Sequence, residues 1–433
     1  MTIEHFFKNP FPHNKQSTKN VFKKKKFLMP TYRNLYIDGC CSDLTVTDDR
    51  VVSIEPADPT KEFDDSIDCN GSFWALPAMV NMHTHSAMTL FRSAGSGLPL
   101  QPWLHEVIFP REAQLTPDDV FMGVRQACDE MRASGTLALN DMYFHVDQAI
   151  RAVCQAHMEG NIALSVTDND FNTEGEFRQL LSRFDSLQQQ CGDDITLTIA
   201  PHSIYAVNAK HLQYLADFTH ERNLPYHIHI SETQAERENC IRQNGVPPVV
   251  WLDRLGILDK TQSCFIGAHA LWLDDTEIAL LGERHCNVVH CPNSNLKLGS
   301  GCRFRYVELR DAGVNVTLGT DGCASSDNLD LLEAMKVMSL LQKGTRQDPS
   351  VLPSHEVFQV ATANGWHALH RPHRGLKPGD KARFFLVDIN RNIFSGVTDP
   401  QLSPSQRQTL FLDRLIYAAH SDTIHPIPQH HTS

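Results

Sequence analysis

The sequence predicts an α/β protein: a (β/α)8 TIM-type barrel with a small β-sandwich satellite built from both flanks of the chain. The main observation is that apolar, strand-like runs alternate with segments of helical periodicity, and eight such pairs are typical of this barrel. A chain of 433 residues that is 41% hydrophobic is also long enough for one barrel and one satellite. The alternative architecture for such an alternation is a doubly wound open sheet.

The strand-like runs are spread over the middle of the chain. They lie at residues 77–85, 136–144, 161–168, 194–201, 225–230, 263–269, 286–290 and 314–320. Segments of helical periodicity separate them, and the clearest is 117–134, which follows the cap-like Thr116. We therefore assign residues 77–370 to a metal-dependent barrel.

Both flanks of the barrel carry strand-like segments of a second kind. Between residues 29 and 76, short alternating runs are separated by turn residues, a pattern typical of a small antiparallel sheet. The segment 371–420 supplies a turn and a strand at 376–387, which we expect to pair with that sheet. A strand that would close the satellite is not recognisable after Tyr417.

The two ends of the chain differ from the rest. Residues 1–28 include the run Lys23–Lys26 and lack a regular pattern, so we interpret them as a disordered tail or as sequence upstream of a natural start at Met29. Residues 421–433 are rich in proline and histidine and are predicted to be a second disordered tail. His430 and His431 are therefore assigned to that tail and not to a metal site.

Composition and cysteine usage limit the classes of binding partner and the cellular compartment that we expect for the protein. The net charge of −12 argues against nucleic acid or an anionic membrane surface as the main partner. No apolar run approaches the ~18 residues of a membrane span. The 12 cysteines form no C-x-x-C pair, and no secretory signal is visible, so we expect reduced thiols and a cytoplasmic location. The expected partner is a small-molecule substrate.

The first barrel strand ends in His83 and His85. Side chains two residues apart on a strand point the same way, so both imidazoles can hold one metal ion. The alternative is that they are two unrelated histidines of the core or the surface. The choice depends on whether other strands supply the missing ligands.

The carboxyl ends of the later strands carry the polar residues that such a site needs. Active-site groups of a barrel lie at these ends. In chain order, the ends carry His202, then His227, His229 and Glu232, then His269, His290 and Asp321. One or two of these histidines could be ordinary core residues, but that reading does not account for the whole series.

Three histidines and one aspartate suit a borderline cation such as zinc, with iron as the alternative. We choose His83, His85, His229 and Asp321 as metal ligands. His229 is preferred to His227 because it lies nearer the end of the strand, and we expect His227 to pack or to orient a ligand. A metal in this position lowers the pKa of its water towards ~7. Glu232 can then transfer the proton of that water, while His269 and Asp321 hold the developing charge.

At these residues the sequence resembles the amidohydrolase superfamily. It is similar to the branch of mononuclear deaminases and chlorohydrolases that includes 5′-methylthioadenosine/S-adenosylhomocysteine deaminase. The motifs, which span roughly residues 35–390 in family order, are Pro77-x-x-x-Asn81-x-His83-x-His85, Phe109-Pro-Arg-Glu112-x-x-Leu115-Thr116, Pro201-His202-Ser203-x-Tyr205, His229-x-Ser231-Glu232-Thr233, His290-Cys-Pro-x-Ser294-Asn295-x-Lys297-Leu298-x-Ser300-Gly301 and Gly319-Thr-Asp321-Gly322.

The resemblance implies roles for further residues. Glu112 matches a residue that binds ribose hydroxyls in the adenosine-type deaminases, and His202 matches a histidine near the sugar and base. Ser325 falls in the loop that flanks the substrate. The resemblance also implies a homo-oligomer, because members of the superfamily are often dimers or tetramers. Trp103 follows the first strand and is a candidate for lining an apolar substrate pocket, although lone aromatic residues are more often core.

The chain departs from the family pattern at one substrate position. An arginine that binds the ribose or the tail of the substrate is expected near 169–190, and the only candidates are Arg178 and Arg183, which fit a helix surface equally well. The end of the fourth strand carries no lysine, which argues against the two-metal branch that uses a carbamylated lysine.

Three functions are compatible with these residues. The first is hydrolytic deamination of an adenosine-type nucleoside, such as adenosine, 5′-methylthioadenosine or S-adenosylhomocysteine, with release of ammonia. The second is hydrolysis of another aminated or chlorinated heterocycle, such as guanine, a pterin or a triazine. The third is a metal-binding scaffold without catalysis, which Glu232 argues against, because a closed structural site has no use for such a carboxylate.

Overall fold

The structure is a computed structural model that describes residues 30–61, 66–170 and 173–426. The tail predicted at 1–28 and residues 427–433 of the second tail lie outside this part of the chain. The described residues fall into two compact units. Within the described ranges, one unit draws on residues 30–61, 66–77, 373–414 and 423–426, and the other on 78–170, 173–372 and 415–422.

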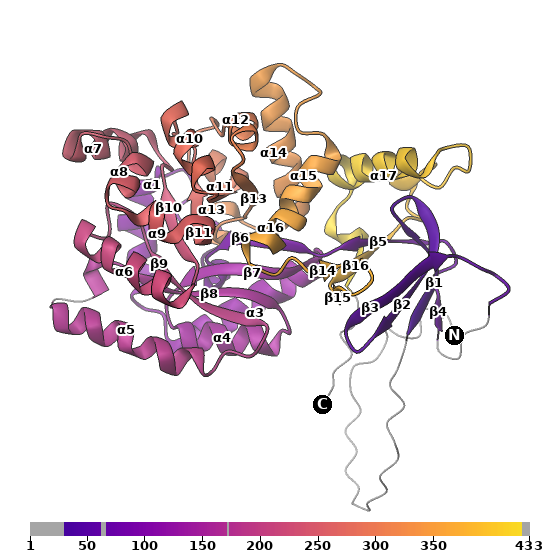
Figure 1. The fold of residues 1–433 in the computed structure, drawn as a ribbon, viewed down its shortest axis with the longest axis horizontal. Coiled ribbons are helices and arrows are strands. Elements are labelled where there is room, and N and C mark those ends of the chain that lie inside the picture. Colours follow the sequence, from indigo (N-terminus) through magenta and orange to yellow (C-terminus); the bar gives the residue numbers. More distant parts are fainter. Residues whose placement is uncertain (1–29, 62–65, 171–172, 427–433) are drawn as a thin grey trace, which may run out of the picture. The chain divides into compact units, whose positions relative to one another are not determined.

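The larger unit is the expected barrel. Its strands form one parallel sheet in which the neighbours follow chain order, so the reversal of strand order that defines a doubly wound sheet does not occur. The eight strands match the eight predicted runs (Figure 1): β6 (Met79–Thr84), β7 (Thr136–Tyr143), β8 (Glu159–Val166), β9 (Ile195–Pro201), β10 (Tyr226–Ile230), β11 (Phe265–His269), β12 (Asn287–His290) and β13 (Asn315–Leu318).

The first and last strands meet at their carboxyl ends. The backbone N–H of Asp321, just past β13, donates to the carbonyl of His83 at 2.9 Å. Gly319 makes this approach possible, since a Cβ at that position would lie 2.8 Å from the backbone nitrogen of His83. Two segments that are far apart in the sequence are thereby brought side by side.

Helices follow the barrel strands, as the sequence predicts. The helix after Thr116 begins with a capping box in which the Thr116 hydroxyl and the Asp119 carboxylate each accept a backbone N–H. The longer helices of this unit are α3 (Pro117–Ala133), α4 (Val146–Gln155), α5 (Glu174–Gln188), α6 (Ala209–Arg222), α7 (Gln234–Asn244), α8 (Pro248–Arg254), α10 (Asp275–Glu283), α14 (Leu331–Arg346) and α15 (Ser354–Ala361).

Shorter helical segments occupy the connections. They are η2 (Ser86–Phe91), α1 (Leu100–Pro102), η3 (Trp103–Ile108), α2 (Phe109–Glu112), η4 (Asp168–Asp170), α9 (Ile257–Thr261), η5 (Gln262–Cys264), α11 (Pro292–Lys297), α12 (Tyr306–Asp311), α13 (Cys323–Ser326) and α16 (Ala363–Ala368). The segment η3 is a π-helix, a form that often occurs at functional sites. No helix in the described part of the chain is long and apolar enough to cross a membrane.

The smaller unit is a β-sheet built from both flanks of the chain. Its strands are β1 (Thr31–Ile37), β2 (Cys40–Thr47), β3 (Arg50–Pro56), β4 (Ser66–Asp68), β5 (Phe73–Pro77), β14 (Arg374–Gly375), β15 (Lys381–Ala382), β16 (Phe384–Asp388) and β17 (Ile424–Pro426). All nine belong to one hydrogen-bonded sheet, so the two layers of the predicted sandwich are not separate sheets. The predicted strand at 376–387 is β16, which pairs antiparallel with β5.

The prediction of a disordered tail from residue 421 is wrong for residues 421–426. The helix α17 (Pro404–Ala418) is followed by the short turn η7 (Ser421–Thr423) and then by β17, which pairs antiparallel with β16. This is the closing strand that is not recognisable in the sequence. Three residues that include a histidine and a proline give no alternating pattern, and the backbone pairing with β16 is what makes them a strand.

The core of the smaller unit joins Leu35 from one flank to Phe384 from the other in one buried cluster, and Trp74 forms an aromatic stack in the same unit. The Trp74 ring stacks on Tyr36 at 5.2 Å between centroids and on Phe411 of α17 at 4.1 Å. Leu35 and Phe385 are fully buried in the same unit. Residues from both flanks therefore share one core, as the sequence predicts for the satellite.

Candidate metal centre and active site

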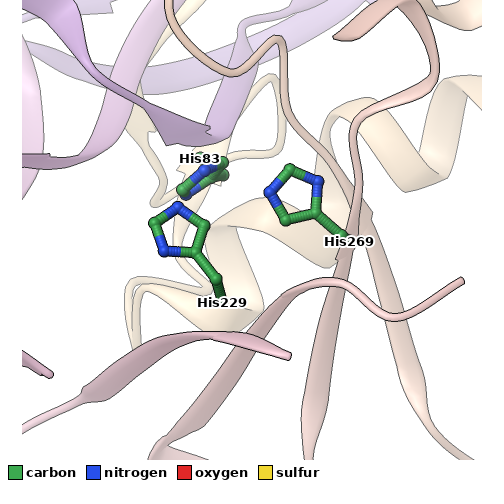
Figure 2. Close-up of side chains that lie close together, drawn as sticks. All are labelled: His83, His229 and His269. Atoms are coloured by element: carbon green, nitrogen blue, oxygen red, sulfur yellow. The ribbon is translucent and has the colours of Figure 1, made fainter. Parts of the chain in front are cut away.

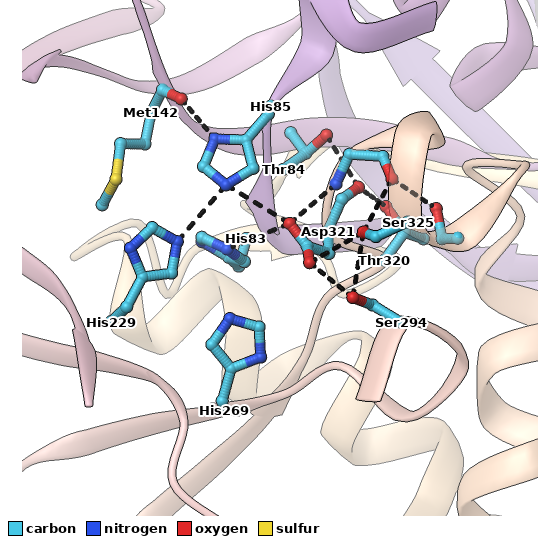
Figure 3. Close-up of polar contacts among 12 residues, drawn as sticks. His83, Thr84, His85, Met142, His229, His269, Ser294, Thr320, Asp321 and Ser325 are labelled. Atoms are coloured by element: carbon cyan, nitrogen blue, oxygen red, sulfur yellow. Dashed lines mark hydrogen bonds and ion pairs between the residues drawn. The ribbon is translucent and has the colours of Figure 1, made fainter. Parts of the chain in front are cut away.

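The four residues chosen as metal ligands converge at the carboxyl end of the barrel. His83 and His85 project from the end of β6, His229 from β10, and Asp321 from the turn after β13 (Figure 3). The Nε2 atoms of His83 and His85 lie 3.5 and 3.3 Å from Oδ1 of Asp321. Nε2 of His229 lies 3.3 Å from Nε2 of His85. Four potential donor atoms therefore face one small volume.

The backbone fixes the orientation of two of these imidazoles. Nδ1 of His85 lies 2.5 Å from the carbonyl oxygen of Met142, and Nδ1 of His229 lies 2.7 Å from that of His202. A carbonyl oxygen only accepts, so each Nδ1 carries the proton and each Nε2 presents a lone pair to the centre. This arrangement is the one that metal-binding histidines adopt.

His83 lacks a hydrogen-bond partner where a metal would sit. Its Nε2 is fully buried and makes no hydrogen bond within the described structure, although buried polar atoms are nearly always paired. Its Nδ1 lies 3.0 Å from Nε2 of His227, whose Nδ1 contacts the Asn140 amide at 3.1 Å. The orphaned Nε2 of His83 is the observation in this site that fits a bound cation. The contact at Nδ1 of His83 gives His227 an orienting position.

Burial favours the neutral imidazoles of His83 and His229. Desolvation lowers the pKa of His83 to about 3 and that of His229 well below its usual value. Burial alone would raise the pKa of Asp321, but its contacts with His83 and the neighbouring His85 hold that pKa well below the usual range. Neutral imidazoles beside an ionised carboxylate are the protonation states in which a metal is bound.

The second oxygen of Asp321 is held by hydroxyl groups. Ser294 and Ser325 donate to Oδ2 at 2.6 and 2.9 Å, while the N–H of Gly322 donates to Oδ1 at 2.8 Å (Figure 3). Ser325 was predicted as a substrate-binding residue. In the structure it is buried behind Asp321 and does not line the cavity described below. The short helix after Asp321 brings the Ser325 hydroxyl within hydrogen-bond distance of the Asp321 carboxylate. A spacing of four residues in the sequence does not by itself predict this contact.

Glu232 and His269 lie beside the cluster. Ser300 donates to Oε1 of Glu232 at 3.0 Å, and Oε2 lies 3.9 Å from Nε2 of His269. The amide nitrogen of Asn295 donates to Nδ1 of His269 at 2.9 Å, so the neutral imidazole carries its proton on Nε2. Burial raises the pKa of Glu232, and the nearby Asp321 adds to that shift, while His269 opposes it.

His269 also faces the residues chosen as metal ligands. Potential ligand atoms of His83, His229 and His269 lie within 4.8 Å of one another, and Figure 2 shows the three rings turned towards one another.

The backbone at the strand ends is held in an uncommon conformation. Ser231, His269 and Asp321 have φ angles of 51°, 74° and 64°, although none of them is glycine. Such conformations persist where the surrounding structure fixes them, and they cluster at functional sites.

A cavity of about 680 Å³ opens over these residues. Its polar end contains His85, His202, His229, Glu232, His269 and Asp321. A second wall comes from the segment between β6 and α3, including Trp103, Leu104, Ile108, Phe109 and Glu112. The cavity therefore combines the ionisable cluster with an apolar surface, which is the usual make-up of a small-molecule site.

Residues 74–412 match a family model described as the amidohydrolase family. The chain belongs to this family. A 5′-deoxyadenosine deaminase of Methanoregula boonei is 42% identical over 315 residues, which cover 72% of this chain and 71% of that protein. A 5-methylthioadenosine/S-adenosylhomocysteine deaminase of Archaeoglobus fulgidus is 37% identical over 349 residues, covering 81% and 79%.

A solved structure supports the same relationship. An adenosine deaminase from Xanthomonas campestris with bound zinc superimposes with a TM-score of 0.80 at 28% identity, covering 92% of this chain and 90% of that one. The expected amidohydrolase fold is thus confirmed by sequence and by structure.

The remaining predicted site residues of this amidohydrolase lie in the cavity wall. Trp103 is buried and donates its indole N–H to the carbonyl of Ala94 at 2.8 Å. Glu112 ends α2, and burial of its carboxyl raises its pKa to about 7, although part of the residue is exposed. His202 contacts the Ser203 hydroxyl at 3.2 Å, and burial lowers its pKa to about 4.

Several residues that shape the site have contacts that the sequence does not predict. Ser294, Asn295 and Ser300 belong to a motif that the sequence displays, but a short polar side chain in a motif does not reveal which group it will contact. Tyr143 ends β7, lines the cavity and lies next to the Glu112 carboxyl. Its aromatic ring in an apolar run is indistinguishable, in the sequence, from a core residue.

Proposed function

We propose that this amidohydrolase is a metal-dependent hydrolytic deaminase that acts on adenosine-type nucleosides and releases ammonia. The observation that carries the proposal is that one cavity is lined by three residues of the ligand cluster (His85, His229 and Asp321) together with Glu232 and Glu112. The ligand cluster and Glu232 provide for hydrolysis of a C–N bond, and Glu112 provides for a ribose. The names of the similar deaminases support the same substrate class.

We assign the metal to His83, His85, His229 and Asp321. The lone pairs on Nε2 of His85 and His229 and the orphaned Nε2 of His83 support this set. Three imidazoles and a carboxylate suit zinc, and the zinc in the similar adenosine deaminase agrees, with iron as the alternative. A divalent cation supplies the positive charge that makes a water molecule acidic at neutral pH.

Glu232 is assigned to proton transfer. Burial raises its pKa, which favours the protonated form that Glu232 takes between accepting a proton from water and delivering it to the ring nitrogen next to C6. The water oxygen forms a bond to C6, the bond from C6 to the amino group breaks, and ammonia leaves a 6-oxo product. Ser300 occupies Oε1, so Oε2, on the side of His269, is the oxygen available for this transfer.

His269 and Asp321 are assigned to the charge that develops during the attack. His269 carries a proton on Nε2, which can donate to an oxygen bound at C6. Asp321 keeps Oδ1 on the side of His83 and His85, because Ser294 and Ser325 occupy its other oxygen. It can therefore accept a hydrogen bond from the attacking water without turning away from the cluster.

Glu112, His202 and Trp103 are assigned to the substrate. A carboxylate such as Glu112 can accept hydrogen bonds from the two neighbouring hydroxyls of a ribose. His202 lies between the ligand His229, whose ring centroid is 4.6 Å away, and Tyr205. Trp103 supplies apolar surface, because its N–H is already bonded to the backbone.

The test is a substrate panel with ammonia detection. The metal-loaded protein should release ammonia from adenosine, 5′-deoxyadenosine, 5′-methylthioadenosine or S-adenosylhomocysteine. It should not do so from guanine, a pterin or an aminotriazine. Preferred turnover of a free base, unchanged by Glu112→Gln, would contradict the nucleoside assignment, because a free base has no ribose hydroxyls for Glu112 to hold.

A further inference from the structure

A second buried carboxylate lies four residues beyond Glu232. Glu236 sits in the first turn of α7 and is only 7% exposed, yet it does not line the cavity. Its carboxylate turns back to the chain that precedes the helix. The N–H of Ser231 donates to Oε1 and the N–H of Glu232 donates to Oε2, both at 2.8 Å.

The turn after β10 needs these two acceptors. The chain leaves the strand at Ile230, and Ser231 adopts a φ of 51°, so its N–H and that of Glu232 lie beyond the paired residues of β10. Buried N–H groups without acceptors are costly. The carbonyl of Ser231 is also engaged, since it accepts the N–H groups of Leu271 and Trp272 at 3.0 Å each. Every backbone polar group of Ser231 is thus bound.

The helix that carries Glu236 is itself anchored. Thr233 caps α7 by accepting the N–H of Glu236 at 3.1 Å. The adjacent Arg237 donates to Asp274 at 2.5 Å, to Glu277 and to the carbonyl of Trp272 at 3.1 Å. The first turn of the helix that carries Glu236 is therefore fixed by its cap and by Arg237.

A carboxylate at this position is costly to the fold. Burial raises the pKa of Glu236 to about 8, and the neighbouring charge of Glu232 acts in the same direction, against the backbone N–H groups of Ser231, Glu232 and Thr233, which lower it. An apolar residue would avoid that cost. Glutamine would keep the shape, but it offers only one acceptor where the turn presents two donors.

We propose that Glu236 is a positioning residue for Glu232. By binding the N–H groups of Ser231 and Glu232, it fixes the backbone from which the Glu232 side chain reaches Ser300 and His269. A small displacement of a catalytic group costs much of its rate. The inference rests on the proposed function only in taking Glu232 as the proton-transfer group.

The main experiment compares Glu236→Gln with Glu238→Gln, the same substitution at an exposed position of the same helix. Glu236→Gln should lower kcat by roughly 10- to 100-fold and leave KM within about twofold, because the cavity wall that binds substrate is untouched. Glu238→Gln should change neither. A loss expressed mainly in KM, with kcat retained, would overturn the proposal.

A double-mutant cycle separates positioning from general damage to the fold. In a Glu232→Gln background, Glu236→Gln should change kcat by less than about twofold, since the group that it positions is already gone. An equal loss of kcat in both backgrounds would overturn the proposal. Should Glu236→Gln not fold, Glu236→Asp keeps both oxygens with a shorter reach. It should show the same kcat loss with an unchanged circular dichroism spectrum, and full activity in that variant would overturn the proposal.

One readout is independent of the substrate. Backbone hydrogen exchange of the substrate-free protein should accelerate in peptides that contain Ser231 and Glu232 in Glu236→Gln, and not in Glu238→Gln. Unchanged exchange would overturn the positioning role. If no nucleoside released ammonia while exchange accelerated as expected, the proposed function would fail and the backbone role of Glu236 would stand.

Discussion

At the scale of single residues, Asp321 shows how one side chain is divided between two tasks. Its Oδ1 faces Nε2 of His83 and His85, and its Oδ2 is bound by the hydroxyls of Ser294 and Ser325. Those hydroxyls donate to either an aspartate or an asparagine oxygen, so an amide can occupy the same space. What the amide lacks is the negative charge and the second oxygen, which accepts the N–H of Gly322 and faces the imidazoles of His83 and His85.

Asp321→Asn is therefore expected to abolish turnover while the fold survives. We expect a loss of kcat of at least about 10³-fold, because the substitution removes a ligand charge and a proton acceptor together. Ammonia release and circular dichroism measure the two outcomes. Asp193→Asn, at an exposed position outside the site, is the control. Near-normal activity in Asp321→Asn would show that the ligand set is misassigned.

Glu112 gives a prediction about pH. Burial raises its pKa to about 7, so the carboxyl is protonated below that pH and ionised above it. Hydrogen bonds to an ionised acceptor are about twice as strong as neutral ones, so we expect the KM for a ribonucleoside to fall about fivefold between roughly pH 6 and pH 8.

The matched measurement uses 2′,3′-dideoxyadenosine, which lacks both hydroxyls. Its KM should not show this fall, whereas any change that arises from Glu232 would affect both substrates equally. Glu112→Gln should remove the difference between the two pH profiles. Parallel profiles in the wild-type protein would argue that Glu112 does not hold the ribose.

At the scale of elements, the site depends on how closely β13 approaches β6. The backbone of Gly319 passes so near His83 that a Cβ would lie 2.8 to 2.9 Å from the backbone nitrogen, the Cβ and the backbone oxygen of that residue. Backbone atoms cannot move aside as the end of a side chain can. The glycine is needed for this close approach and not for an unusual φ angle.

Gly319→Ala should therefore separate the two strand ends and displace His83. We expect a loss of about 1–3 kcal/mol of folding free energy and a weaker affinity for zinc. Gly344→Ala, in the last turn of α14 with open space around the added Cβ, is the control and should stabilise the protein by about 0.5–1 kcal/mol. Urea unfolding and a zinc titration test both. Equal behaviour of the two variants would contradict the packing argument.

At the scale of the whole molecule, the proposed metal joins segments that are distant in the chain. Its ligands come from the first, fifth and last strands of the barrel. An ion that binds these groups only when they are together favours the folded state by mass action.

Removal of the metal with a chelator should lower Tm as well as activity. If the free metal concentration before chelation is 100 times the Kd, removal of the metal lowers the free energy of unfolding by about 2.7 kcal/mol. Zinc added back should restore both. In Asp321→Asn, the chelator should shift Tm by less than in the wild-type protein. A Tm that does not respond to the chelator would argue against a metal that bridges the strands.

Much of the barrel was predictable because each of its strands has a hydrophobic pattern that can be recognised within a few residues. The eight apolar runs all became barrel strands, and the cap at Thr116 begins a helix, since hydrophobic period and capping chemistry act over a few residues. The closing strand Ile424–Pro426 was missed for the opposite reason. Three residues are too few to show the alternating hydrophobicity of a strand, and they form one only because they pair with β16.

The sequence by itself determined which residues stand at the ends of the strands, and so which chemistry the chain can bring together. Only the tertiary structure decided where their atoms point. It turned Ser325 towards Asp321 and away from the cavity, and it set Glu236 against the turn that carries Glu232. The physical reason is that strand periodicity is a local property. The direction of a polar side chain depends on donors and acceptors that folding brings from elsewhere in the chain.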